Sequence, residues 1–268
     1  MNPLKKTYQD AMAFVDSFIN STTPTFDKPE ELPKDADAWY ATWEDNYIGD
    51  FLNNSITKSG LQKIADTYYA SQLEELVRKS TELSALTHPS LFKIYKSCCK
   101  RLGFVNLPKL YVTGQIRDIN ALSIEVKGRR LILLSRMSTI RLSEQELRFI
   151  IGHELGHHQQ GNLACHTVNG LLDTLNNSSE IFGPMISDTI EVPMKRWCRQ
   201  SEFNADIAGL ICCENLEVII NLFLKLGMQP NQSAYHEYRE LDSSHPHLNT
   251  RLAALTQYTN SQKNIIPL

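Results

Sequence analysis

Two histidines and a glutamate share one short segment near the middle of the chain, His153-Glu154-Leu155-Gly156-His157. On a helix, positions four apart lie on one face, so both imidazoles can reach a single metal ion at the usual ~2.0–2.1 Å. Glu154 sits about 100° around the axis from His153, where it meets a water molecule rather than the metal. The pattern predicts a zinc site with a general base beside it. The alternative is a helix that carries two surface histidines and no metal.

A second helical segment, Ser201–Asp206, supplies the carboxylate that a catalytic zinc site with three protein ligands requires. Glu202 and Asp206 are four apart and face the same way. We expect Glu202 to bind the metal and Asp206 to accept the second ring N–H of a ligand histidine. The alternative is an acidic pair on a solvated helix face. The apolar neighbours of the pair disfavour that alternative, because buried carboxylates need a partner and a zinc site provides one.

A histidine-proline segment near the C-terminal end, His245-Pro-His-Leu248, is followed by Arg251. A histidine and an arginine brought close to the zinc would stabilise the oxyanion of a tetrahedral intermediate. Alternatively, His245 fills the open metal position in the resting protein. The sequence leaves both roles of His245 open, because many loops contain a His-Pro pair.

The elements around the motif are visible as changes of periodicity. Ser143 and Glu146 have the spacing of a capping box, which opens the helix that carries the two histidines. Upstream, the runs 109–113, 119–126 and 130–135 predict three strands, and the turn Lys127-Gly128 joins the last two. Helical periodicity covers residues 61–83 and 89–102, and most of the chain after Ser143. The expected fold class is therefore α+β, mostly helical with a small three-stranded sheet packed beside the active-site helix.

Composition excludes several classes of protein. The chain has 268 residues, with 27 Lys and Arg against 30 Asp and Glu, so no overall charge draws it to nucleic acid or to an anionic membrane. No segment predicts a transmembrane helix or a secretory signal. Six cysteines without a CxxC pair predict reduced, buried thiols. We therefore expect a soluble cytoplasmic protein, with secretion by a route without a cleavable signal left open.

The N-terminal part of the chain differs from the rest. Residues 7–19 predict a short helix, and three prolines lie in 20–37. Residues 27–50 hold eight acidic residues against two lysines, with four Trp and Tyr residues among them. We interpret residues 1–83 as a helical extension with an acidic loop, a possible lid or pro-segment, and residues 84–268 as the metallopeptidase domain.

Together these residues resemble the zinc metallopeptidase family of HtpX and the CAAX-prenyl endopeptidases, over about residues 85 to 258. The family combines HExxH with a downstream ExxxD-type helix, as in Glu202 and Asp206, and then a His-Pro loop with an arginine after it. An Asn-Ala pair on an edge strand before the active-site helix is similar to Asn120-Ala121 here. Residues 159–195 are too polar to span a bilayer, unlike the corresponding part of the integral-membrane members, so the resemblance is to a soluble member.

The resemblance implies a zincin-like fold, one zinc ion per chain and a role for each matched residue. The implied zinc ligands are His153, His157 and Glu202; Glu154 is general base and acid, with His245 and Arg251 as further catalytic residues and Asp206 bonded to a ligand. The implied substrate strand is Asn120, Ala121 and Leu122, whose backbone would pair with an extended peptide by strand addition.

The expected function is a zinc-dependent endopeptidase that hydrolyses peptide bonds in extended or unfolded protein segments. The alternative from another class is a non-catalytic, zinc-stabilised module that binds peptides or acts like a chaperone. Glu154 disfavours the alternative, since a purely structural zinc site has no use for that carboxylate.

Overall fold

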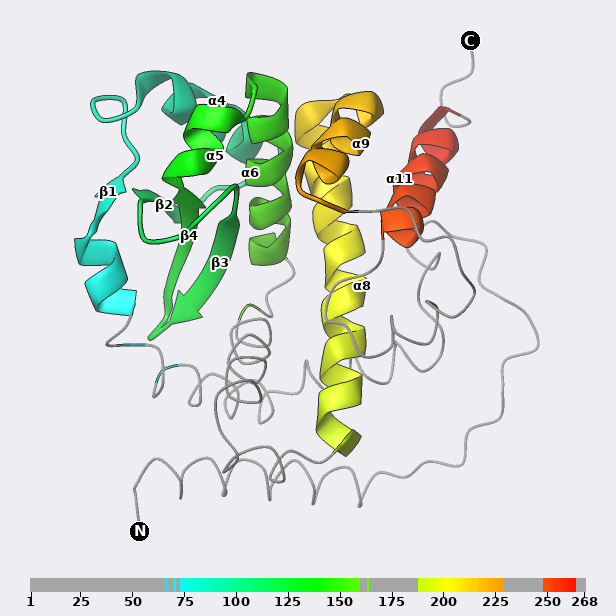
Figure 1. Ribbon diagram of the computed structural model, residues 1–268, viewed down its shortest axis with the longest axis horizontal. Coiled ribbons are helices and arrows are strands. Elements are labelled where there is room, and N and C mark those ends of the chain that lie inside the picture. Colours follow the sequence, from blue (N-terminus) through cyan, green and yellow to red (C-terminus); the bar gives the residue numbers. More distant parts are fainter. Residues whose placement is uncertain are drawn as a thin grey trace.

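The computed structural model describes residues 73–159, 188–228 and 248–263, together with Asp66, Ala70 and Leu163 (Figure 1). In chain order the elements are β1 (Ser80–Glu82), α4 (Pro89–Arg101), β2 (Lys109–Thr113), β3 (Ala121–Val126), β4 (Arg129–Ser135), α5 (Arg136–Arg141), α6 (Glu144–Gln159), α8 (Asp188–Cys213), α9 (Leu216–Lys225) and α11 (Leu248–Lys263). The expected class is confirmed, because the described part is mostly helical with one small sheet. The expected helix at 7–19 and the acidic loop lie outside the described residues.

The sheet has four strands in the order β1-β2-β4-β3. The central pair β2 and β4 is parallel, and β1 and β3 pair antiparallel on either side. The three predicted strands are confirmed, and so is the turn between the last two: Lys127 and Gly128 both have positive φ, at 50° and 68°, as a two-residue hairpin turn requires. The sequence did not predict the fourth strand, β1, because it lies within residues 61–83, where the periodicity is helical. Its three residues are too few to show an alternating pattern.

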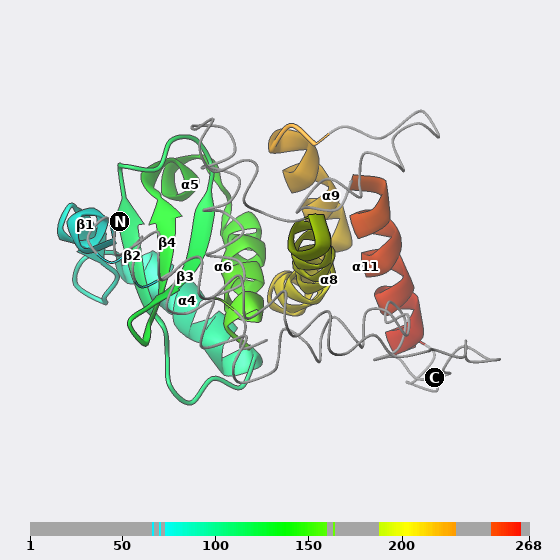
Figure 2. The same ribbon diagram turned by 90° about the horizontal axis from the view of Figure 1, so that it is seen from below.

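The two faces of the sheet are covered by different layers. Along β4, Ile132 and Leu134 join the core that includes residues of α4 and α6. Leu131 and Leu133 point the other way and pack with Leu73, upstream of β1. Figure 2 shows α6 beside the edge strand β3, then α8, and α11 on the far side of α8. Helix α6 therefore lies between the sheet and α8.

Helix α6 begins at the capping box that the sequence predicts. The backbone N–H of Ser143 donates to Glu146 Oε2 (2.7 Å), and the backbone N–H of Glu146 donates to Ser143 Oγ (3.3 Å). Lys225, at the end of α9, adds a charge-assisted bond to Glu146 Oε1 (3.0 Å). The start of the helix is thus fixed both locally and from a distant helix.

Small residues let α6 and α8 approach very closely. A Cβ built on Gly152 would lie 2.8 Å from Cys212 Cβ, and one on Gly156 would lie 2.8 Å from Ala205 Cα. On α8, a Cβ on Gly209 would meet the ring of Phe149 at 2.7 Å. Real Cβ atoms do not tolerate such distances, so glycine is required where these two helices cross.

No helix within the described ranges is both long and apolar enough to cross a membrane. The five cysteines in these ranges are all buried and free, in agreement with the reduced thiols that the sequence predicts.

Candidate metal centre

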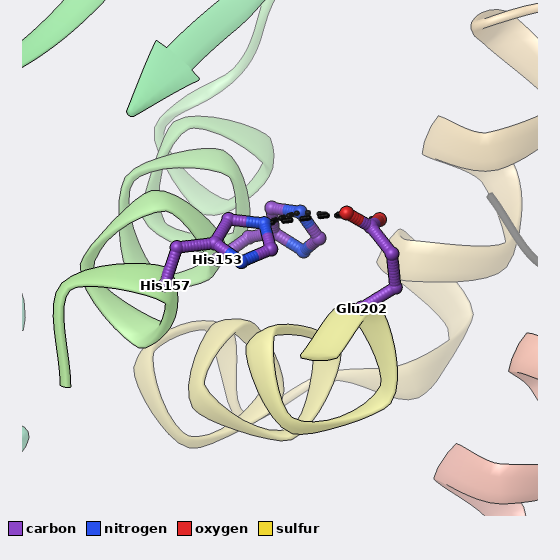
Figure 3. A group of neighbouring side chains, drawn as sticks. All are labelled: His153, His157 and Glu202. Carbon is purple, nitrogen blue, oxygen red and sulfur yellow. Dashed lines mark hydrogen bonds and ion pairs between the residues drawn. The ribbon is translucent and has the colours of Figure 1, made fainter. Parts of the chain in front are cut away.

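The close approach of α6 and α8 brings two imidazoles and one carboxylate to a common point (Figure 3). His153 Nε2 lies 3.2 Å from His157 Nε2 and 3.6 Å from Glu202 Oε2. His157 Nε2 lies 3.3 Å from Glu202 Oε1. All three residues are at most 9% exposed.

The two imidazoles and the carboxylate are placed so that they could hold a single metal ion. A tetrahedral zinc site with bonds of ~2.0–2.1 Å places its ligand atoms about 3.3–3.4 Å apart. The two imidazole nitrogens, 3.2 Å apart, lie at nearly that edge length. Each of them is also close to one oxygen of Glu202, and the three residues offer one ligand atom apiece within 4.8 Å of one another. Two nitrogens and one oxygen are a ligand set that zinc accepts, and among the residues that the structure describes no fourth ligand completes the tetrahedron. Three protein ligands of this kind are typical of catalytic zinc sites.

Asp206 and Arg251 interact with the residues that are expected to bind the metal. The Nδ1–H of His153 donates to Asp206 Oδ1 (3.0 Å), which turns Nε2 toward the other donors. Arg251 donates from Nε to Asp206 Oδ2 (2.6 Å), and its Nη1 lies 3.6 Å from Glu202 Oε2. The guanidinium also stacks over the Phe223 ring, 4.6 Å from its centroid. Such partners fix the tautomer and orientation of a ligand histidine.

Burial and charge together set the pKa values of these groups. Burial disfavours the charged form of His153, but the carboxylates of Glu202 and Asp206 outweigh burial and raise its pKa above the ordinary value. Burial dominates at His157 and lowers its pKa. Asp206 is fully buried, yet the charge of Arg251 and the bond from His153 hold its pKa below the usual range. Asp206 therefore stays ionised as an acceptor for both neighbours.

Glu154 lies next to the ligands and is 7% exposed. The hydroxyl of Ser123, on β3, donates to Glu154 Oε2 (2.7 Å) and lies 2.9 Å from the backbone oxygen of Glu154. Ser123 belongs to none of the motifs that the sequence shows. The only signal was strand alternation, which gives it the same face as Ala121, and that signal does not say which helix the face covers.

The strand expected to bind substrate lies at the edge of the sheet, with β4 as its partner on one side. Hydrogen bonds fix Asn120, the residue directly before β3. The backbone N–H of Asn120 donates to Ser138 Oγ (3.0 Å), and the backbone oxygen of Asn120 accepts from Ser138 Oγ (3.0 Å) and from the N–H of Ser135 (2.9 Å). Leu122 is 43% exposed and Ala121 is partly buried.

The structure brings together most of the residues that the sequence predicts for the site. They are His153, His157, Glu202, Asp206, Glu154 and Arg251, with β3 beside them. His245 lies outside the described residues.

The site is that of an HExxH metallopeptidase with a glutamate as third ligand. The profile of Peptidase family M48 matches residues 85–259, which is most of the chain. The chain therefore belongs to peptidase family M48, and its His153, His157 and Glu202 form the metal site of a zinc metallopeptidase.

Two known proteins resemble the chain more distantly. One is the plastoglobule-localized metallopeptidase 48, chloroplastic, of Arabidopsis thaliana, which is 29% identical over 124 residues, covering 46% of this chain and 36% of that protein. The other is the crystal structure of Ste24p from S. mikatae, with a TM-score of 0.49 and 20% identity over 80% of this chain and 61% of that one. The aligned part spans little more than a third of the Arabidopsis protein.

Proposed function

We propose that the protein is a zinc-dependent endopeptidase that hydrolyses peptide bonds in extended or unfolded protein segments. The observation that carries the proposal is the convergence of two imidazoles and the Glu202 carboxylate beside Glu154, a buried carboxylate adjacent to His153. A structural site would close its fourth position with protein and would not need that carboxylate.

Each residue has a role in the proposed reaction. His153, His157 and Glu202 would hold a zinc ion, which would supply Lewis acidity and lower the pKa of a water molecule. Glu154 takes the proton of the attacking water and delivers it to the leaving amine. Asp206 keeps His153 in its ligand tautomer.

Two further residues are assigned in the proposal. His245 stabilises the oxyanion of the tetrahedral intermediate or, in the resting protein, binds the metal as its fourth ligand. Arg251 acts as a positioning residue, because its described bonds run to Asp206 and its Nη1 lies 3.6 Å from Glu202 Oε2.

The substrate in this proposal is an extended peptide. The edge strand at Asn120, Ala121 and Leu122 would receive it by pairing backbone N–H and C=O groups, which reads shape rather than sequence. This mode suits unfolded segments, because folded substrates have already paired these groups.

Within the N-terminal extension, residues 1 to about 60 are proposed to lie over the metal site, whereas residues 80–82 form strand β1 of the sheet. Its acidic stretch at 27–50 carries a net charge opposite to that of a metal cation. Deleting residues 1 to about 60 is expected to raise the cleavage rate, and an unchanged or lower rate would argue against a lid.

The experiment that tests the function compares the zinc-loaded wild type with Glu154→Gln on a reduced, alkylated model protein without a fold. The proposal predicts fragments from the wild type only, loss of cleavage with a chelator and recovery on adding zinc. Cleavage by Glu154→Gln at the wild-type rate would refute the role of Glu154. If neither protein cuts although both bind zinc, and deletion of the extension does not unmask activity, the peptidase proposal fails in favour of a peptide-binding module.

A further inference from the structure

Ser123 lies on the edge strand β3, and its side chain contacts Glu154, the glutamate beside the metal site. Its neighbour two positions earlier, Ala121, packs against the core that contains α6 residues, whereas Ile124 and Val126 belong to the opposite face of the sheet. Alternation along the strand therefore directs the Ser123 side chain at α6. In the register of the sheet, Ser123 lies opposite Ile132, which is fully buried in the same core.

The hydroxyl of Ser123 has two acceptors and one hydrogen. Oγ lies 2.7 Å from Glu154 Oε2 and 2.9 Å from the backbone oxygen of Glu154. Neither of these oxygens can donate when the carboxyl group is ionised, so Ser123 is the donor in each case. The hydroxyl can hold the carboxylate, and it still has an acceptor at the helix backbone when the carboxylate swings away. Glu154 can thus move without leaving a buried donor unpaired.

The backbone N–H and C=O groups of Ser123 point away from β4, toward the outer edge of the sheet. The N–H of Ser135 donates to the backbone oxygen of Asn120, which sets the pairing that repeats every second residue along this antiparallel pair. The main-chain groups of Leu122 and Ile124 therefore point to β4, and those of Ser123 point to the outer edge. A peptide added to that edge would pair with the N–H and C=O of Ser123.

We propose that Ser123 is a positioning residue that couples the substrate-binding strand to the general base. Its backbone pairs with the extended substrate, while its hydroxyl holds the carboxylate of Glu154 at Oε2. Ser123 keeps its own proton throughout and forms no covalent bond. The inference rests on the proposed peptidase function and adds a residue to it, since neither the HExxH pattern nor the ExxxD helix includes this serine.

The kinetic test compares Ser123→Thr with Ser123→Val. The two side chains have the same shape and both suit a strand, but only threonine keeps the hydroxyl. We expect the kcat of Ser123→Val to fall about tenfold or more, the effect of losing one hydrogen bond to a charged group. KM is expected to stay within about twofold, because the main-chain pairing is unchanged. Ser123→Thr is expected to recover most of the wild-type kcat, and zinc content is expected to be equal in all three proteins. Equal kcat values for the threonine and valine variants would overturn the inference.

A second measurement does not depend on activity. In the zinc-free protein, the urea midpoints of Ser123→Ala, Glu154→Ala and the double variant test the contact directly. The contact predicts that the two substitutions are non-additive, because the second removes an interaction already lost. Additive midpoint shifts would overturn the inference.

The two proposals fail in different ways. If the wild type cleaves and Glu154→Gln does not, while the threonine and valine variants are alike, only the role of Ser123 is refuted. If the wild type does not cleave at all, the peptidase function fails, and the midpoints of the zinc-free variants still decide whether Ser123 holds Glu154.

Discussion

Gly156 offers the sharpest test of how the metal site is built, because it lies inside the histidine motif and against α8. A Cβ at this position would lie 2.8 Å from Ala205 Cα and 2.9 Å from Ala208 Cβ. Carbon atoms pack best at about 3.5–4.0 Å, so Gly156→Ala requires α6 and α8 to separate by roughly 0.7 Å. Both obstacles are main-chain or Cβ atoms, which cannot rotate away.

The size of this displacement decides the expected effect. Zinc ligand distances tolerate only about ±0.2 Å, and Glu202 is carried by the helix that must move. Overpacking costs about 1–3 kcal/mol, and alanine returns up to about 1 kcal/mol of helix propensity relative to glycine. We therefore expect the zinc-free protein to lose about 1 kcal/mol of unfolding free energy and zinc affinity to fall about tenfold or more.

The assay is competitive zinc titration with a fluorescent chelator, beside urea unfolding of the zinc-free protein. Gly114→Ala is the matched control, because a Cβ at Gly114 would meet nothing within 4 Å. Its zinc affinity should equal that of the wild type. Wild-type zinc affinity in Gly156→Ala would refute the view that the close crossing of α6 and α8 sets the ligand geometry.

Three further predictions concern the charges around the site and the metal itself. Arg251→Met should destabilise the zinc-free protein by about 3 kcal/mol in urea, because it leaves Asp206 fully buried without its cation; Arg148→Met, at a partly exposed ion pair, should cost less than about 1 kcal/mol. Burial disfavours the ionised form of Glu146, but the bonds from Ser143 and Lys225 outweigh burial and lower the pKa of its carboxyl group. The contribution of Glu146 to the free energy of unfolding is therefore complete at a pH above the pKa of an unfolded glutamate. It is lost as the pH falls through the lower pKa that Glu146 has in the folded protein. The free energy gap between wild type and Glu146→Gln, about 1 kcal/mol at pH 7, should therefore close on acidification, and a gap independent of pH would contradict this. Zinc at 100 times its dissociation constant should stabilise the fold by about 2.7 kcal/mol, and a chelator should reverse the shift in Tm.

Local spacing carried most of what the sequence could predict. The positions of His153 and His157 follow from helix geometry alone, and the capping box at Ser143 is a contact between residues three apart. The turn at Lys127-Gly128 is likewise local, since the backbone demands positive φ at both residues. Such features depend on residues close in sequence, which is why the pattern was sufficient to identify them.

Long-range packing was out of reach of the same reasoning. The partner of Arg251 lies 45 positions away on α8, and nothing in the spacing distinguishes an arginine bound to Asp206 from one facing an oxyanion. Ser123 contacts Glu154 from 31 positions away, through a strand whose partner helix the sequence does not reveal. Strand β1 is held by pairing with β2 rather than by its own three residues.

The most direct test of the central claim is the zinc content of four purified proteins, measured by atomic absorption after dialysis against a weak chelator. If His153, His157 and Glu202 hold the metal and Glu154 serves the chemistry, the wild type and Glu154→Gln should each retain about one zinc per chain, while His153→Ala and Glu202→Ala should lose it. Full retention of zinc in Glu202→Ala, or loss of zinc in Glu154→Gln, would contradict the assignment of the ligands.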